Sequence, residues 1–269
     1  FKLHEVEGHR IEGHTALGNC TMGIWWDVHC HDLYAEDLIL VDNTVNLQYE
    51  LSSGPLVVRR MLSAGGRAED GVVHLWGGTS EIHDSLLYQD YDANGRGLLY
   101  AFRIGERNDP HANQRPMVPG PQILRDSLLV GGARTAAFAM MDDVRRDPVA
   151  SGGFVPYRGE RNVFWHPRRP EFWNAWVADP ARSGEEAKRA VKIPEWLSAH
   201  ALEVEPRQVD PMLRDPKNHD YRISSVSSLY RERGRWPQVA LSAATRREMA
   251  RFFEWSGFQP DRWGPLPPE

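Results

Sequence analysis

Hydrophobic and polar residues alternate from Gly23 onward. The two alternating rows are, first, Ile24, Trp26, Val28 and Cys30 and, second, Trp25, Asp27, His29 and His31. Strict alternation is typical of a half-buried strand. One apolar face and one polar, histidine-bearing face fit a sheet whose interior holds a site. The pattern therefore predicts a strand over residues 23–31 with a polar face toward a pocket.

Short apolar runs separated by turn residues continue this pattern. They cover residues 38–41, 45–51, 56–62, 72–76, 86–91 and 97–104. Asp42-Asn43 and Asn94-Gly95 tolerate left-handed backbone, so each predicts a hairpin. About seven short strands in succession point to an antiparallel sandwich or barrel. No internal repeat is evident in the sequence.

Regular structure is expected to stop after residue 104, because residues 105–122 hold four prolines and many polar residues. The apolar runs 123–130 and 135–141 fit either further strands or a short helix. Residues 147–173 are again irregular. The expected fold class is mainly β with C-terminal helices (α+β). We expect two parts: a β-rich barrel over residues 1–146, and an irregular or helical extension over residues 147–269 that packs on it or on a partner.

Three helices are expected near the C-terminus. Ser183 and Glu186 form a capping box, which predicts a helix that Pro194 interrupts. A second helix is expected from Pro194 to about Leu202. Ser242 is placed to cap a third helix that runs through Phe253.

Composition narrows the class of protein. A hydrophobic content of 41% and 26% charged residues are ordinary for a soluble protein, and no apolar run approaches the roughly 20 residues of a membrane span. The formal charge of −5 provides no basic field for nucleic acid. Cys20 and Cys30 are too few for a disulfide framework, so we expect an intracellular compartment, cytoplasmic or organellar. The chain begins with Phe1, which indicates a processed chain or a fragment.

A metal site is the main chemical candidate. His29 and His31 are one residue apart, so in an extended strand they point to one face. Glu36 can return to that face from the next strand. Two imidazoles and a carboxylate suit one divalent metal: Fe, Mn, Ni, Zn or Cu. Asp27 on the same face would orient a ligand or act as a base, and Trp25 would line the substrate pocket.

The spacing of Gly23, His29, His31 and Glu36 resembles the first motif of the cupin superfamily, a small antiparallel β-barrel that holds a metal between its sheets. Asn43 stands where that family usually has a glycine.

Residues 71–83 resemble the second cupin motif, although Trp76 replaces its proline and two extra residues precede His83. The resemblance spans about residues 20–105. It implies that His83 joins the two earlier histidines and Glu36 as a metal ligand, with His74 as the alternative.

Several functions stay open on this basis. The first is a metal-dependent enzyme, a dioxygenase, isomerase or lyase, that acts on a small organic substrate. The second is a non-catalytic accessory or scaffold subunit with a protein partner or as a homo-oligomer, because arginine and tryptophan suit interfaces. A carbohydrate-binding module is a third, based on ten tryptophans. Among eleven histidines a His-x-His pair also arises by chance, and His4, His9 and His14 fit surface or structural roles.

Overall fold

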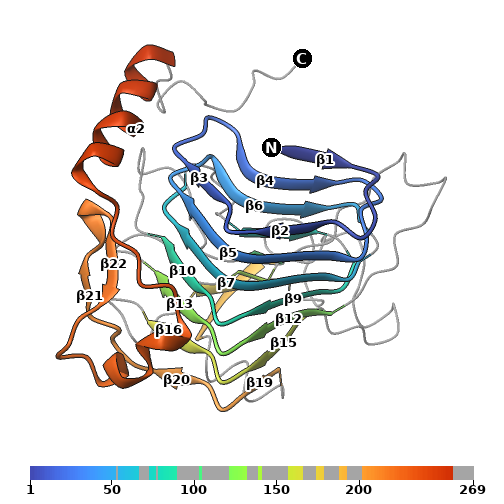
Figure 1. The fold of residues 1–269 in the computed structure, drawn as a ribbon. Helices are drawn as coiled ribbons and strands as arrows, with labels where there is room; N and C mark the ends of the chain where they lie inside the picture. Colours follow the sequence, from blue (N-terminus) through green and yellow to red (C-terminus); the bar gives the residue numbers. More distant parts are fainter. Residues whose placement is uncertain are drawn as a thin grey trace.

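The strands of this protein wind into stacked coils. The computed structural model describes residues 1–52, 54–66, 73–76, 78–89, 103–104, 121–131, 139–140, 157–165, 174–178, 188–192 and 202–256. In that part the chain is mainly β, as predicted, and the two large sheets are built from parallel pairs. The arrangement is a parallel β-helix (Figure 1), so the predicted antiparallel barrel or sandwich is wrong.

A six-stranded sheet forms one side of the coils. Its strands, in order, are β1 (Lys2–His4), β4 (Met22–Asp27), β6 (Val45–Glu50), β8 (Val73–Trp76), β11 (Arg103–Ile104) and β14 (Ala139–Met140). All five neighbouring pairs are parallel.

A larger, bent sheet forms the remaining sides. Its strands are β2 (Arg10–Glu12), β3 (Thr15–Leu17), β5 (Leu33–Val41), β7 (Leu56–Ala64), β9 (Ser80–His83), β10 (Leu86–Gln89), β12 (Gln122–Arg125), β13 (Leu128–Gly131), β15 (Tyr157–Glu160), β16 (Val163–Trp165), β19 (Glu203–Val204) and β20 (Arg207–Gln208). The bend recurs at one residue with positive φ in each coil. These residues are Gly13, Asp37, Arg60, Asp84, Asp126, Arg161 and Glu205.

The register shows a structural repeat. Lys2 lies opposite Trp25 and Trp25 opposite Gln48, so each of these coils takes 23 residues. Ser80 lies opposite Gln122, because a long insertion separates these two coils. The expectation of no internal repeat is therefore wrong.

Asp42 marks a corner between two sheets. β5 pairs with β7, whereas β6 pairs with β4 and β8. The predicted hairpin over residues 38–51 is therefore wrong, although both of its strands exist. The predicted turn at Asn94-Gly95 lies outside the described residues.

The interior of the coils is an apolar core. Its largest fully buried side chains include Trp26, Tyr49, Ile24 and Leu47. Burial on both faces is the usual setting of parallel strands. The prediction that Ile24 and Trp26 share one apolar face is confirmed, but that face is the interior one. The predicted orientation, with the polar face of Trp25 and Asp27 toward an interior pocket, is therefore wrong.

Side chains satisfy the backbone amides at the bend. Ser85 Oγ accepts from the Met61 amide at 3.1 Å, and Ser127 Oγ accepts from the Ser85 amide at 3.2 Å. Asn162 Oδ1 accepts from the Ser127 amide at 2.9 Å. Each coil thus supplies the hydrogen bond that the left-handed bend of its neighbour needs.

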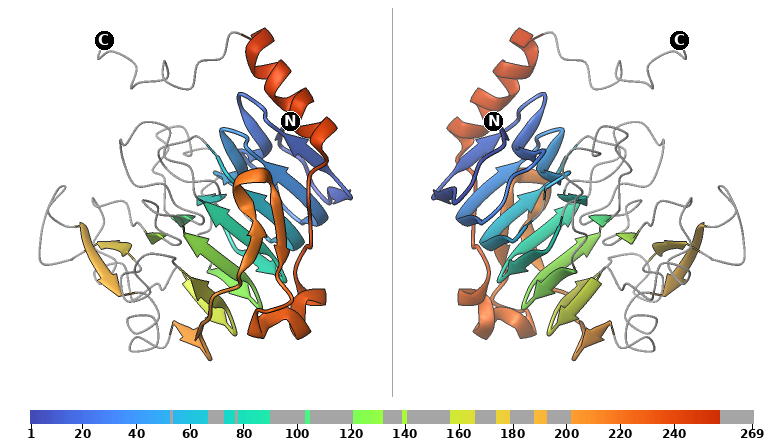
Figure 2. Two further views of the ribbon diagram at one scale, coloured as in Figure 1. Left: turned by 90° about the vertical axis from the view of Figure 1, so that its left-hand side faces the viewer. Right: turned by 90° about the vertical axis from the view of Figure 1, so that its right-hand side faces the viewer.

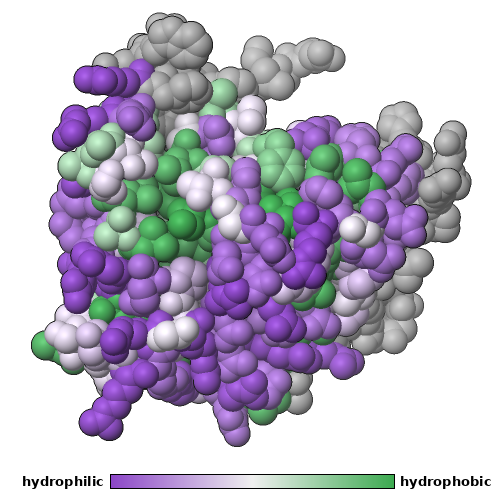
Figure 3. Space-filling model, viewed as in Figure 1, coloured by the Kyte–Doolittle hydropathy of each residue, from purple (hydrophilic) through white to green (hydrophobic). Residues whose placement is uncertain are grey.

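The C-terminal segment, residues 209–256, packs on the outside of the bent sheet (Figure 2). It contains β21 (Leu213–Asp215), η3 (Pro216–Asn218), β22 (Asp220–Ile223), η4 (Ser228–Arg235) and α2 (Ala243–Ser256). Trp236, Tyr221 and Leu229 of this segment share one hydrophobic cluster with Leu62 and Leu128. Figure 3 shows apolar surface at the upper left and mainly hydrophilic surface across the middle.

The C-terminal helix is confirmed: Ser242 Oγ accepts from the Thr245 amide at 3.0 Å, and α2 follows. The capping box at Ser183 lies outside the described residues, and so do residues 194–201 of the second predicted helix. The helix predicted after the capping box is wrong at its second half, because β18 (Lys188–Lys192) is a strand paired antiparallel with β17 (Asn174–Ala178).

The predicted boundary at residue 146 does not separate two sheets. β15 pairs with β12, and β16 pairs with β13, so both halves share the coils. None of the helices in the described part of the chain combines the length and hydrophobicity that a membrane crossing needs.

Candidate functional site

The outer face of the six-stranded sheet carries two rows of polar side chains. Because side chains alternate along a strand, the residues between the interior ones face outward. The register places Lys2, Trp25, Gln48 and His74 in one row, and His4 and Asp27 in the next, with Glu50 on the neighbouring strand.

Asp27 is the centre of this face. Its Oδ2 lies 2.6 Å from Lys2 Nζ and 2.8 Å from His4 Nε2. The carboxylate side chain is only 8% exposed, whereas those of Lys2 and His4 are 43% and 50% exposed. The parallel register of β1 and β4 sets His4 directly opposite Asp27. One shielded carboxylate therefore holds an ammonium group and an imidazole that both reach solvent.

Trp25 lies beside this group. Lys2 Nζ is 3.6 Å from the centroid of the Trp25 ring, a cation–π distance. Trp25 and Asp27, the predicted substrate-binding and catalytic residues, thus share the outer face of β4 and both contact Lys2. Whether they perform those roles stays a prediction.

Sequence reasoning missed Lys2 and His4. The histidine spacing within residues 1–22 matched no single element, and these residues were expected to form an irregular lead-in or short edge strands. The short strands are confirmed, because β1, β2 and β3 have three residues each and β1 is the edge strand of its sheet. The usable signal is the 23-residue coil, which aligns Lys2 with Trp25 and His4 with Asp27.

The same face continues as buried polar groups. Gln48, Glu50 and His74 are 5%, 1% and 3% exposed. Gln48 donates from Nε2 to the Glu50 carboxylate. The Val28 amide donates to the Glu50 carbonyl at 3.1 Å, which ties the ends of β4 and β6 together. The exposed part of the face is therefore the Lys2, His4 and Trp25 end.

The predicted histidine-bearing strand ends early. Val28 and His29 both have positive φ, 37° and 58°, so β4 stops at Asp27. His29 and His31 then lie in the corner before β5 and not on the polar face of a strand. The prediction of one extended strand over residues 23–31 is wrong for this reason.

Glu36 and His83 lie on the bent sheet, each with other partners. Glu36 accepts from the Tyr34 hydroxyl at 2.7 Å and pairs with Arg60 at 2.5 Å. The Tyr34 hydrogen bond, with the Arg60 charge, lowers the Glu36 pKa.

His83 Nε2 lies 3.0 Å from Glu81 Oε2. In the backbone register of the bent sheet, Arg59 of β7 lies opposite Glu36 of β5 on one side and opposite His83 of β9 on the other. Two strand spacings, about 9.5 Å, therefore separate the backbones of Glu36 and His83. His74 belongs to the other sheet. In the described structure, the predicted ligands are not gathered around one point.

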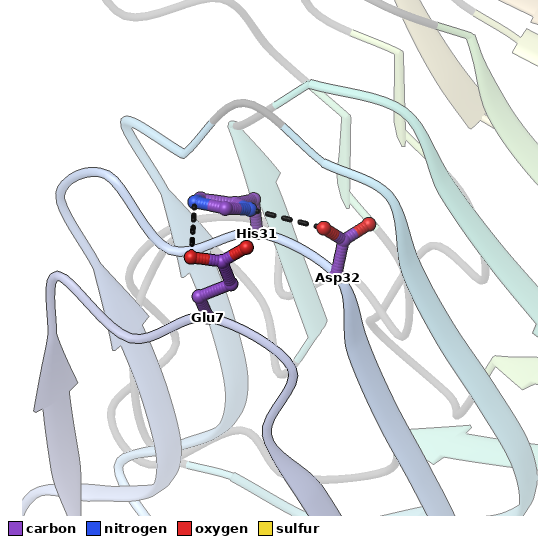
Figure 4. Close-up of side chains that lie close together, drawn as sticks. All are labelled: Glu7, His31 and Asp32. Carbon is purple, nitrogen blue, oxygen red and sulfur yellow. Dashed lines mark hydrogen bonds and ion pairs between the residues drawn. The ribbon is translucent and has the colours of Figure 1, made fainter.

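His31 instead belongs to a different group with Glu7 and Asp32 (Figure 4). Its Nδ1 lies 3.1 Å from Asp32 Oδ2, and its Nε2 lies 3.9 Å from Glu7 Oε2. Within the part of the chain that the structure describes, these are the only three metal-ligating side chains with ligand atoms within 4.8 Å of one another. The group suits a divalent metal, and it equally suits an imidazole held between two carboxylates without a metal.

No protein-family model matches this chain, and neither curated proteins nor solved structures gave a significant match. The cupin resemblance therefore rests on the motif residues alone, and the parallel coils differ from the barrel that it implies.

Proposed function

We propose that the outer face of the six-stranded sheet binds a linear carbohydrate, and that His4 performs acid–base chemistry on it beside Lys2. The observation that carries this proposal is the Asp27 carboxylate, which contacts Lys2 Nζ and His4 Nε2 at 2.6 and 2.8 Å.

This group has the parts that proton transfer requires. Asp27 fixes the orientation of the His4 ring through Nε2, as a carboxylate does for a catalytic histidine. His4 Nδ1 has no hydrogen-bond partner among the described residues, so it is available to a substrate proton. The Lys2 ammonium group lies on the same carboxylate and can stabilise negative charge that develops on the substrate.

The shape of the face supports an extended substrate. Adjacent strands place equivalent side chains about 4.8 Å apart, and stacked coils give long binding surfaces suited to polymers. The net charge of −5 disfavours nucleic acid as that polymer. At the exposed end of the face, the lysine, histidine and tryptophan side chains offer both hydrogen bonds and a flat apolar ring to a sugar.

A depolymerisation assay tests the proposal. The protein is incubated with soluble neutral and uronate-containing polysaccharides, and new reducing ends and ultraviolet-absorbing unsaturated products are measured. Replacing His4 by Ala should reduce the rate about 100-fold or more, because a positioned base contributes that much. His31→Ala, in the neighbouring corner, is the matched control and should keep the rate. A panel without any cleavage, or full activity in His4→Ala, would overturn the proposal.

A divalent-metal site is a second candidate, favoured by the Glu7–His31–Asp32 group. It retains the expected metal, with His31 as the one predicted ligand in the group. Titration with zinc and manganese should then give one binding event that His31→Ala removes and His29→Ala preserves. Equal binding by both variants would contradict this candidate.

A further inference from the structure

The Glu203 side chain projects into the C-terminal end of the parallel β-helix. It lies on β19, in the last described coil (Figure 1), opposite Gly159 of β15. The residue is 4% exposed. A Cβ atom at Gly159 would collide with the Glu203 carboxylate and the Tyr157 hydroxyl. The glycine therefore creates the space that the carboxyl group fills.

Neutral groups surround this carboxyl. The Tyr157 hydroxyl donates to Oε2 at 2.7 Å. Asn162 donates to Oε1 from Nδ2 at 2.9 Å and from its backbone amide at 3.3 Å. Asn162 in turn accepts from the Ser127 amide at 2.9 Å. The carboxyl group is thus the last member of the chain of side-chain hydrogen bonds that runs along the bend.

The charged groups on the neighbouring strands point elsewhere. Arg161 pairs with Asp126 at 2.7 Å and with Glu160. Arg125 of β12 lies 3.5 Å from Glu160 and 3.9 Å from Glu81. Among the described residues, no cation lies within ion-pair distance of Glu203. Burying a carboxylate without a cation is costly, and burial raises the pKa of Glu203 to about 7, against the hydrogen bonds from Tyr157 and Asn162.

Glu203 lies where the last described coil joins the rest of the parallel β-helix. The Gly159 amide donates to the Leu202 carbonyl and the Arg161 amide to the Val204 carbonyl, both at 2.7 Å. The Arg207 amide donates to the Asn162 carbonyl at 2.9 Å. Arg207 also pairs with Glu232 of the C-terminal segment at 2.9 Å. Opening at β19 would therefore loosen the attachment of that segment as well.

We propose that Glu203 is a proton-sensitive switch that holds the last coil closed when its carboxyl is neutral and lets it open when the carboxyl is ionised. A closed coil binds the Glu203 proton more tightly than an open, hydrated coil does. Closure is therefore strongest below the pKa of a hydrated glutamate. Closure weakens as the pH rises from there to the pKa that Glu203 has in the closed coil. Above that pKa, Glu203 is ionised in both the closed and the open coil, so closure no longer changes with pH.

Hydrogen exchange of the Gly159, Arg161 and Arg207 amides tests this switch. After correction for intrinsic exchange, opening should increase on the order of 50-fold between about pH 5 and about pH 8. Glu203→Gln stays neutral and should abolish this increase. Glu205→Gln, an exposed carboxyl two residues away, should retain it.

The proposal is overturned if Glu203→Gln opens with the same pH dependence as the wild type, or if wild-type opening does not change. A titration of the wild-type protein carrying carboxyl-labelled glutamate covers the case in which Glu203→Gln does not fold. One carboxyl should then titrate near pH 7, and an ordinary titration of every glutamate would equally overturn the switch.

Discussion

His219 Nε2 lies 2.7 Å from Asp42 Oδ2, although the two residues are 177 positions apart. Asp42 occupies the positive-φ corner between β5 and β6, and His219 has positive φ after η3. About four-fifths of each side chain is shielded from solvent. The contact ties the C-terminal segment to an early coil.

Replacing His219 by Ala should lower the free energy of unfolding by about 1 kcal/mol, because a hydrogen bond to a carboxylate is lost. Chemical denaturation measures this change. The exposed neighbour Lys217 is the control, and Lys217→Ala should alter stability by less than about 0.5 kcal/mol. Equal effects of the two variants would contradict the role of the contact.

Asp126 makes the second tie to the same segment. Arg161 Nε and Nη2 donate to its two carboxylate oxygens at 2.8 and 2.7 Å, and Arg235 Nη1 donates at 2.9 Å. Trp236 Nε1 donates to its carbonyl at 2.7 Å. The hydrogen bonds from Arg161, with the Arg235 charge, lower the pKa of Asp126.

Because this pKa is lower in the folded state, Asp126 stabilises the fold above the unfolded pKa, and that stabilisation is lost as the pH falls through the folded pKa. Asp126→Asn should lower the free energy of unfolding by about 1 to 2 kcal/mol at neutral pH. It should also reduce the decrease of that free energy at acidic pH, the acid limb of the stability curve. Urea denaturation from about pH 2 to about pH 7 checks this.

Asp37 provides the matched control for Asp126. It occupies the equivalent bend position and also binds an arginine, Arg60, but its side chain is 56% exposed. Solvent screens such a pair, so Asp37→Asn should change the acid limb far less. An acid limb that is the same in wild type and Asp126→Asn would refute the prediction.

Asn43 is fully buried at the corner of the second coil. Its Nδ2 donates to the Ala16 carbonyl at 3.0 Å and to Asn46 Oδ1 at 2.9 Å, and its Oδ1 accepts from the Asn19 backbone amide at 3.0 Å. Asn43→Ala should lower the free energy of unfolding by about 1 to 3 kcal/mol, because the Ala16 carbonyl, Asn46 Oδ1 and the Asn19 amide each lose a hydrogen bond. Thermal unfolding beside the exposed control Asn218→Ala measures the difference, and similar melting temperatures would disprove it.

Local patterns in the sequence located many elements correctly. The runs over residues 56–62 and 72–76 coincide with β7 and β8, and Ser242 begins α2. These features depend on alternation and capping within a few residues. The partner of each strand depends on a residue one coil away, which short-range patterns do not reveal.

The repeat is visible once the bend residue is known. The five-residue segments that contain it are EDLIL, RRMLS, HDSLL, RDSLL and ERNVF, at residues 36–40, 59–63, 83–87, 125–129 and 160–164. Their spacing changes from 23 and 24 residues to 42 and 35, because insertions lengthen the later coils. Unequal spacing hides the repeat from a search at one period.

The candidate site was predicted in part. Alternation correctly set Trp25 and Asp27 on one face, but it assigned His29 and His31 to the same strand. Two consecutive left-handed residues, Val28 and His29, end that strand, and β-branched valine is among the least expected residues there. The expected protein partner and compartment stay predictions.

The location of the functional face is tested most directly by hydrogen exchange with and without an oligosaccharide that the protein binds. The ligand should slow exchange in residues 1–4 and 22–27, and exchange over residues 33–41 and 56–64 of the bent sheet should be unchanged. Slowing confined to the bent sheet, or to the C-terminal segment, would contradict the assignment of the six-stranded sheet as the functional face.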